Sequence, residues 1–170
     1  SPLVSGPVAV VQVENQSDSF AAGLDIGTGE NLWKVRRSSK PSWSTPVLLE
    51  GSAGASSLLL QSWDSLSGHD LATGRQLWVH DGETNCIPSC SVHGGLVFLA
   101  AEGVTALRPG SGGAAPEVVW RSSKLRPGMS SPLIHGGKLY ALSGNGILAC
   151  AEPVTGEVSW QVRLKGTFSS

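Results

Sequence analysis

The chain has 170 residues, of which 40% are hydrophobic and 15% charged, a balance typical of a folded globular domain. Its formal net charge of -1 gives no whole-molecule field to attract nucleic acid or an anionic membrane. No apolar run reaches the roughly 18–20 residues that span a bilayer. The 22 glycines and 10 prolines indicate many short elements joined by tight turns.

One nine-residue pattern recurs along the chain and sets its phase. Residues 25–33, 70–78 and 152–160 each begin with an acidic residue, continue with Thr-Gly and end with Trp. In a degenerate copy that ends at Trp120, a Gly-rich insertion at 109–116 replaces the Thr-Gly pair. The repeat tryptophans are Trp33, Trp78, Trp120 and Trp160. Their spacing of about 40–45 residues indicates a repeat architecture.

Each repeat is predicted to contain four short antiparallel strands. In the first repeat, a hairpin at 51–56 precedes a strand at 57–61, and in the second Gly94-Gly95 and Glu102-Gly103 mark the hairpin turns. The clearest repeat has strands at 131–134, 138–143, 147–151 and 158–164, with hairpin turns at Gly136-Gly137 and Asn145-Gly146. Four strands at this period predict an all-β fold, a β-propeller of four four-stranded antiparallel blades.

We expect a single domain, 1–170, with repeats at about 34–78, 79–120, 121–160, and 161–170 joined to 1–33. We join 161–170 to 1–33 because Phe168-Ser169-Ser170 followed by Ser1-Pro2 matches one uninterrupted copy of the repeat. An open arc of four blades leaves two unpaired edges, so we expect half of an eight-bladed ring. A homodimer or the remaining blades of a longer chain would close it. In the homodimer, residues 1 to about 24 of one copy and 158–170 of the other are expected to share a blade.

The repeat motif, Ala-x-Asp-x-x-Thr-Gly-x-x-x-Trp, resembles that of the pyrroloquinoline-quinone-type (PQQ-like) β-propeller family. Its first position holds Gly23, Gly68, Ala106 and Cys150 in the four copies. The resemblance covers essentially the whole chain and implies that the four repeat tryptophans dock each blade onto the next. It also implies a periplasmic or extracytoplasmic location. It does not imply one reaction, because the family contains both quinoprotein alcohol dehydrogenases and cofactor-free assembly lipoproteins.

Quinone-dependent catalysis is disfavoured by what the resemblance would require. The dehydrogenases carry two adjacent cysteines joined as a disulfide, whereas Cys86, Cys90 and Cys150 are all separated. In an extended segment the first two lie roughly 13 Å apart, too far for a disulfide. No Glu, Asn and Asp trio for the family's calcium ion can be placed. We therefore expect no enzyme activity, cofactor or metal. A fragment of a quinone-dependent dehydrogenase is the alternative, and reconstitution with quinone and calcium distinguishes the two.

Other catalytic patterns are weak. Gly27-x-Gly29 lies between two strands and not before a helix, so it is not a nucleotide-binding loop. His93 and His135 occupy equivalent hairpin turns that diverge radially, which argues against a shared metal. No nucleophile elbow is present.

Two features suggest a binding role. The segments between blades are predicted to meet on one face, where Arg37, Lys40, Arg121, Lys124 and Arg126 would form a basic rim for an anionic ligand or acidic partner. Trp43 lies in an innermost segment and is a candidate ligand contact in the central channel. We therefore expect a non-catalytic scaffold for protein or ligand binding. Carbohydrate or small-ligand binding in the channel is a second alternative.

Overall fold

Sixteen strands form four separate antiparallel sheets in the computed structural model, which describes residues 1–51, 56–82 and 84–166. The strands are β1 (Leu3–Ser5), β2 (Val8–Val13), β3 (Phe20–Asp25), β4 (Asn31–Arg36), β5 (Val47–Glu50), β6 (Ser56–Gln61), β7 (Ser65–Asp70), β8 (Gln76–Asp81), β9 (Ser91–His93), β10 (Leu96–Ala100), β11 (Val104–Arg108), β12 (Glu117–Ser122), β13 (Leu133–His135), β14 (Lys138–Leu142), β15 (Ile147–Ala151) and β16 (Val158–Arg163). No helix occurs among the described residues, so none there is long and apolar enough to cross a membrane.

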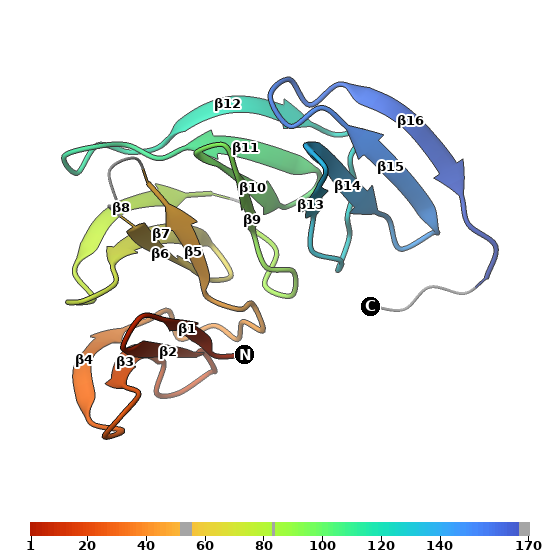
Figure 1. The fold of residues 1–170 in the computed structure, drawn as a ribbon. Helices are drawn as coiled ribbons and strands as arrows, with labels where there is room; N and C mark the ends of the chain where they lie inside the picture. The colour runs from red at the N-terminus through yellow and green to blue at the C-terminus, as the bar shows by residue number, and fades with distance from the viewer. Residues whose placement is uncertain (52–55, 83, 167–170) are drawn as a thin grey trace.

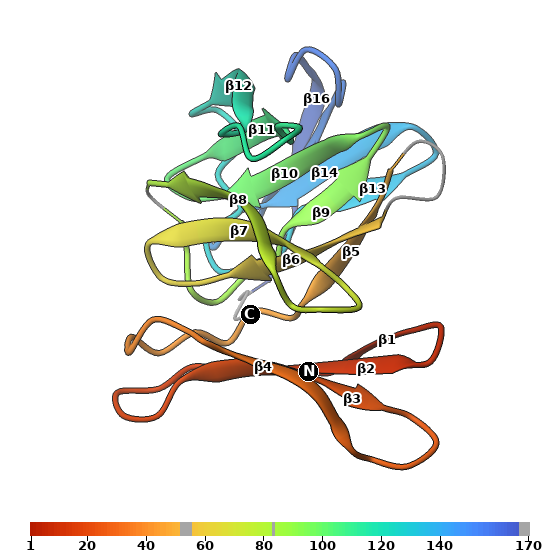
Figure 2. The ribbon, with the colours of Figure 1, turned by 90° about the vertical axis from the view of Figure 1, so that its left-hand side faces the viewer.

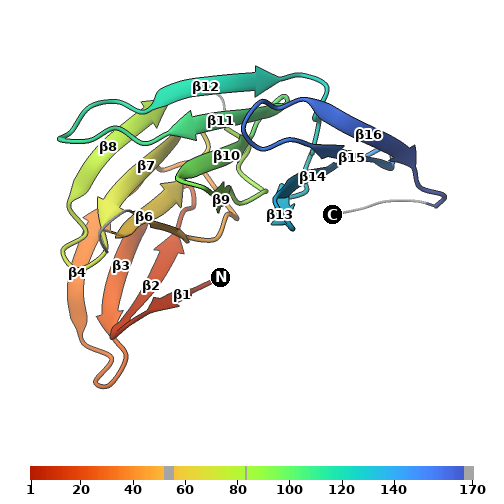
Figure 3. The same ribbon diagram turned by 45° about the horizontal axis from the view of Figure 1, so that its top comes forward.

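Each sheet uses four consecutive strands paired in chain order, and the sheets follow one another around an arc (Figure 1). We call them blades 1 to 4. The first strand of each blade lies on the inner side of the arc, and β4, β8, β12 and β16 lie on its outer side (Figure 3). Blade 1 forms a layer beneath blade 2 when the molecule is seen from the side (Figure 2). The predicted all-β fold of four four-stranded blades is confirmed.

The blades begin and end at different residues from the predicted repeats, each of which ran from one repeat tryptophan to the next. Strand β15 has the predicted bounds, and β13, β14 and β16 differ from prediction by one or two residues. The expectation of a blade shared between two copies is wrong: β4 supplies the fourth strand of blade 1, and β16 pairs with β15 in blade 4. The Trp-ended motif forms the outer strand of its own blade. Residues 52–55 of the predicted hairpin at 51–56 and the segment 168–170 lie outside the described residues.

The core lies between consecutive blades. Apolar side chains form a separate cluster at each of the three junctions. The middle strands are the most buried, and all five residues of β10 are buried because a neighbouring sheet covers each face. The propeller is therefore stabilised mainly by stacking of sheets, at about 25 cal/mol per Å² of apolar area removed from water.

The two ends of the strands form two different faces of the arc. The loop face carries the segments between blades, 37–46, 84–90 and 123–132, and the turns at 14–19, 62–64, 101–103 and 143–146. The turn face carries the Thr-Gly turns at 26–29, 71–74 and 153–156. The candidate sites are placed by this division.

Candidate functional site

The acidic residue of the repeat motif builds a turn. Asp25 Oδ1 accepts hydrogen bonds from the backbone N of Gly27 and Thr28, both at 2.9 Å. The bond from Thr28 N is the main reason why the pKa of Asp25 lies below its usual value. Asp70 Oδ1 binds the backbone N and hydroxyl of Thr73 in the same way. The turn places a glycine at its end with a positive φ, which is +75° at Gly29 and +70° at Gly74.

Trp33 of blade 1 packs on such a turn in blade 2. Its indole Nε1 donates to Leu71 O at 2.9 Å, and its ring covers Gly74, where a Cβ would lie 2.5 Å from Cε3 of the indole. Across its own sheet, Trp33 pairs with Gly23, and a Cβ there would also collide with the indole. The ring is therefore held between the glycines of two blades.

The junction between blades 3 and 4 repeats this arrangement. Trp120 Nε1 donates to Pro153 O at 2.9 Å, and a Cβ at Gly156 would lie 2.7 Å from the ring. At the junction between blades 2 and 3, where an insertion replaces the Thr-Gly pair, Trp78 is 4% exposed and packs in the cluster that contains Leu107. Each of these three predicted residues thus contacts the following blade.

Each end of the arc carries one half of this contact between a Trp and a turn, and neither half has a partner among the described residues. Trp160 of blade 4 is 45% exposed, against 8% for Trp33. At the other end, Ile26 is 57% exposed, and a Cβ at Gly29 would meet nothing within 4 Å. Ile26 and Gly29 are the blade 1 equivalents of Leu71 and Gly74, on which Trp33 rests. One end thus has an uncovered Trp and the other an uncovered turn.

A second contact between blades repeats near the inner strands. Thr45 N donates to Ser89 Oγ at 2.8 Å, and Ser89 N donates to Ser131 Oγ at 2.9 Å. Thr45, Ser89 and Ser131 occupy equivalent positions in their blades, each next to a proline. Their counterpart in blade 1 is Ser1, which precedes Pro2. The series connects blade 2 to blade 3 and blade 3 to blade 4.

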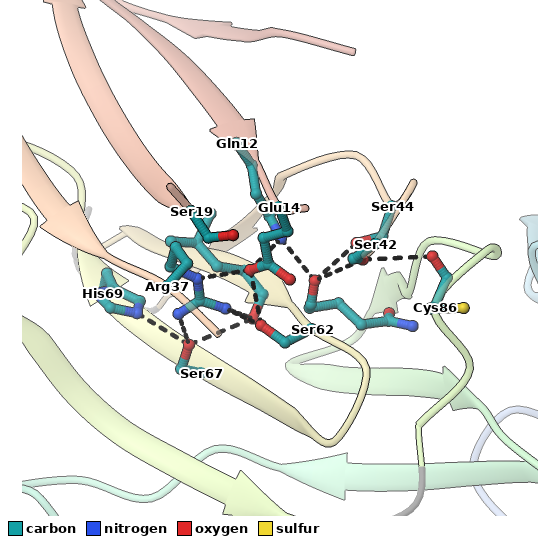
Figure 4. A network of polar contacts seen from close by, with 12 residues as sticks. Gln12, Glu14, Ser19, Arg37, Ser42, Ser44, Ser62, Ser67, His69 and Cys86 are labelled. Atoms are coloured by element: carbon teal, nitrogen blue, oxygen red, sulfur yellow. Dashed lines mark hydrogen bonds and ion pairs between the residues drawn. The ribbon is translucent and has the colours of Figure 1, made fainter. Parts of the chain in front are cut away.

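The loop-face end of the junction between blades 1 and 2 contains a buried ion pair (Figure 4). Arg37 Nε lies 2.9 Å from Glu14 Oε1, and their side chains are 7% and 0% exposed. Glu14 Oε1 also accepts from Ser62 Oγ at 2.7 Å. Arg37 donates to Ser62 Oγ at 2.7 Å, to Ser67 Oγ at 2.9 Å and to Leu60 O at 3.2 Å. The two charges come from blade 1 and most of their polar partners from blade 2, so this network holds the blades in one relative position.

His69 extends the network to the turn under Trp33. Its Nδ1 lies 2.9 Å from Gly74 O, which can only accept, so Nδ1 carries a proton. Its Nε2 lies 2.9 Å from Ser67 Oγ and accepts from that hydroxyl when the ring is neutral. Burial lowers the pKa of His69 below its usual value, the bond to Gly74 O opposes this, and the charge of Arg37 adds to the lowering. His69 is therefore neutral at pH 7.

We expect the free energy of unfolding to decrease when the pH falls below about 6.5. Because the pKa of His69 is lower folded than unfolded, the unfolded chain takes up the proton first, and stability is lost as the pH falls from the unfolded towards the folded pKa. Urea unfolding between pH 8 and pH 5 measures this slope, and His69→Gln should reduce it. Burial also lowers the pKa of His80, so His80→Gln is the comparison and should remove a smaller part. If the free energy of unfolding of His69→Gln depended on pH as steeply as that of the unaltered chain, the assignment of this dependence to His69 would be contradicted.

The predicted basic rim is only partly present. The assignment of Arg37 to this rim is wrong, because its side chain is buried against Glu14. Lys40 is paired with Asp64 at 2.9 Å in a half-exposed ion pair. Arg121 in β12, and Lys124 and Arg126 in the segment that follows it, are exposed and make no ion pair with any described residue. The rim therefore reduces to a cluster of three cations on one side of the arc.

Trp43 lies before the innermost strand β5 and not within it. Its backbone N donates to Cys86 O at 2.7 Å, and its side chain is 64% exposed on the loop face. The three cysteines are buried free thiols, and burial raises the pKa of Cys90 to about 12. A thiol with that pKa is almost fully protonated at neutral pH and is a poor nucleophile.

The polar network was not predicted from the sequence. His69 stands alone in the repeat pattern, and Glu14, Ser62 and Ser67 occupy no motif position. One signal was present: Glu14 follows Val8–Val13, a run that is apolar except for Gln12, and a charge beside such a run is unexpected unless it is paired. Its partner could not be identified, because Arg37 is 23 residues away and reaches it only after two hairpin turns.

Comparison with solved structures gives propellers that are longer than this chain. BamB from Moraxella catarrhalis is 16% identical with a TM-score of 0.72, and the match covers 95% of this chain and 50% of that one. The computationally designed Ika8 protein is 15% identical with a TM-score of 0.70, covering 95% and 48%. A quinohemoprotein alcohol dehydrogenase from Comamonas testosteroni is 16% identical with a TM-score of 0.70, covering 96% and 34%. At these identities the likeness shows the fold alone, and the chain spans about half the length of the first two.

Comparison with curated protein sequences gives no match. A family model described as outer membrane protein assembly factor BamB, which is built on the PQQ-type repeat, matches residues 64–170. This is more than half of the chain and includes the repeat motifs that end at Trp78, Trp120 and Trp160. The PQQ-like resemblance is thereby confirmed, and the chain belongs to the BamB family of PQQ-type β-propellers.

Proposed function

We propose that this chain is a non-catalytic scaffold whose two open ends associate with complementary propeller blades, a second copy of the chain being the partner. The uncovered Trp160 at one end and the uncovered turn of Gly29 at the other carry this proposal. They are the two halves of a contact that the chain makes internally at Trp33 and at Trp120. In the associated form, Trp160 Nε1 of one copy donates to Ile26 O of the other, and its ring covers Gly29.

Three further observations support association with a second copy. Ser131 would donate its backbone N to Ser1 Oγ of the partner, which continues the series from Thr45 to Ser89 and from Ser89 to Ser131. Exposed apolar side chains occur at both ends, among them Val162 of β16 at 45% and Leu32 of β4 at 48%. The chain also matches 50% and 48% of two longer propellers, so two copies equal the length of either. The remaining blades of a longer polypeptide would present the same chemistry and are the alternative outcome of the test.

The contacts of the buried polar groups favour a scaffold function over catalysis. The buried polar groups at the first junction, Glu14, Arg37 and His69, bond to one another and to the neighbouring blade. The family description names an assembly factor, which is consistent with a protein-binding role. The likeness to a quinohemoprotein dehydrogenase is one of fold alone, and its chain is about three times as long as the part that is matched.

The association is tested with two end variants. We expect a mass near twice 17.6 kDa at high concentration for the unaltered chain, decreasing towards 17.6 kDa on dilution. Trp160→Ala should remove the association, because it deletes the aromatic group that fills the contact. Gly29→Ala should weaken it, since its methyl group would occupy the space of the indole. Light scattering at several concentrations measures the mass.

Trp43→Ala is the matched control, because Trp43 is an exposed tryptophan on the loop face, away from both ends. It should leave the mass unchanged. A mass of 17.6 kDa for the unaltered chain at every concentration would contradict docking by a second copy. Association that survives in Trp160→Ala would show that a different surface is used.

A further inference from the structure

The two faces of the arc differ in charge, although the net charge is only -1. Cations gather at the loop face, where the strands end or the chain passes between blades: Arg37, Lys40, Arg121, Lys124, Arg126 and Arg163. Carboxylates gather at the turn face: Asp25, Glu30, Asp70, Glu117, Glu152 and Glu157. Arg37 and Lys40 are paired with carboxylates. Of the other loop-face cations among the described residues, Arg36 lies at the end of β4 in blade 1, and Arg121, Lys124, Arg126 and Arg163 lie on blades 3 and 4.

A buried leucine fixes the position of two of these cations. Leu125 is fully buried in the core between blades 3 and 4, so its neighbours Lys124 and Arg126 are held at the surface. Arg126 Nε donates to Ser123 O at 2.9 Å, which closes the segment on itself and leaves the terminal nitrogens of the guanidinium directed elsewhere. A cation on an anchored loop loses less conformational entropy on binding than one on a free loop.

These cations border a pocket of about 600 Å³ between blades 3 and 4. Small residues of blade 4, Ala141, Gly144 and Ala149, line it together with Lys124 and Arg126. Asn85 Nδ2 donates to Gly128 O at 2.8 Å, which joins the loop beside the pocket to the preceding interblade segment. The pocket is therefore bounded by loops that are bonded to each other.

Two smaller pockets adjoin the first around the tip of the β10–β11 hairpin. All three share Ala101 and Glu102. One, of about 330 Å³, is lined by Trp63 of blade 2, which is 48% exposed. The other, of about 510 Å³, is lined by Arg121. We call these adjoining pockets the groove: it carries the aromatic side chain of Trp63 at its blade 2 end and the cations Lys124 and Arg126 at its blade 4 end.

We propose that this groove binds an extended acidic segment of a partner protein. Carboxylates of the segment pair with Lys124 and Arg126, and an apolar side chain of the segment packs on Trp63. Exposed Trp and Arg side chains are the residue types that contribute most to protein interfaces. Met129, which is 52% exposed beside the cationic pocket, adds apolar area on the same face. Gly29 lies on the turn face, away from the groove, whereas Gln161, next to Trp160 in β16, lines its blade 4 end. Binding is therefore measured at a fixed state of association.

Glu102 sets the polarity of the segment. Its exposed carboxylate lies at the hairpin tip between the two ends of the groove. A carboxylate of the ligand placed beside Glu102 would be repelled, so the acidic residues must lie on the blade 4 side. Removal of this charge is therefore expected to strengthen binding of an acidic ligand, whereas removal of a nearby cation weakens it.

The test uses a fluorescein-labelled peptide of alternating Asp and Phe, about eight residues and about 26 Å long when extended. Fluorescence anisotropy measures its binding to the full chain. We expect the double variant Lys124→Gln, Arg126→Gln to bind about 3- to 10-fold more weakly, as for the loss of two exposed ion pairs. Trp63→Ala should weaken binding several-fold, and Glu102→Gln should strengthen it about 2-fold. Raising the salt from about 0.05 M to about 0.3 M should weaken binding to the unaltered chain.

Arg75→Gln, an exposed cation on the turn face, is the matched control and should bind as the unaltered chain does. Equal loss in this control would show a non-specific charge effect and overturn the proposal. So would unchanged binding in the double variant, or tight binding of the same peptide with Asn in place of Asp. Single-stranded RNA that displaces the peptide and is insensitive to Trp63→Ala would identify a nucleic acid as the ligand instead. Each variant is compared at a concentration where its mass equals that of the unaltered chain.

Discussion

Glu14→Ala should lower the free energy of unfolding by about 3–5 kcal/mol, because it leaves the buried guanidinium of Arg37 without its counter-charge. It also removes the acceptor for Ser62 Oγ at the boundary between blades 1 and 2. Urea unfolding followed by tryptophan fluorescence measures the change, with the protein dilute enough to be monomeric.

The double variant Glu14→Leu, Arg37→Met is the informative control. It replaces both charges by apolar groups of similar size, so we expect much of the lost stability to return. Asp64→Ala, which breaks the half-exposed pair with Lys40, should cost only about 0.2–1 kcal/mol. A cost for Glu14→Ala no larger than that for Asp64→Ala would show that the buried pair does not hold blades 1 and 2 together.

Gly74→Ala should destabilise the chain by about 2–5 kcal/mol. The residue has a φ of +70°, which costs an L-amino acid roughly 1–2 kcal/mol, and its methyl group would lie 2.5 Å from the indole of Trp33. Displacing a ring packed on both sides adds about 1–3 kcal/mol. The bond from Trp33 Nε1 to Leu71 O would be lost with it.

Gly29→Ala separates these two contributions. Gly29 has nearly the same φ, +75°, but a Cβ there meets nothing within 4 Å. In the monomer it should therefore show the backbone cost alone, and its difference from Gly74→Ala measures the packing of Trp33. Equal losses in the two variants would mean that the ring contributes nothing at this junction.

A second pair of glycines, opposite the repeat tryptophans, also bears on how the indoles pack. Gly23 and Gly68 stand where the family motif has alanine, opposite Trp33 and Trp78, the two repeat tryptophans that are almost fully buried. Ala106 stands opposite Trp120, which is more exposed, whereas Trp160, opposite Cys150, is exposed because no following blade covers it among the described residues. A side chain at that position occupies space that the indole would otherwise fill. The residue opposite the Trp therefore affects how deeply the ring packs.

Much of the fold followed from the sequence, because the information is local. The Thr-Gly turns need only Asp25 or Asp70 and the next three residues. Turn residues such as Asn145-Gly146 mark where a strand must end. Repetition of these short signals in phase with Trp predicted four sheets, and the structure has them.

The assignment of charged residues to a rim depended on contacts that no local pattern contains. Arg37 and Arg121 each begin the sequence Arg-Ser-Ser-Lys, yet the first is buried and the second exposed. Arg37 lies four residues after Trp33, beyond the end of β4, whereas Arg121 directly follows Trp120 within β12. The difference arises because Glu14 and Ser62 lie within reach of Arg37, whereas Arg121 meets no carboxylate within ion-pair distance among the described residues. The shared Arg-Ser-Ser-Lys sequence therefore did not indicate which arginine would find a buried carboxylate.

The sequence by itself determined the number of strands, their order within a blade and the position of the Trp on the outer strand of each one. All of these depend on residues within about ten positions of one another and on their periodic recurrence. The tertiary structure alone decided that the Glu14–Arg37 pair joins blades 1 and 2, that Trp160 and Gly29 stay uncovered, and that Lys124 and Arg126 border a groove. The physical reason is that burial and charge pairing depend on distances between segments far apart in the chain, and only the stacking of the blades sets those distances.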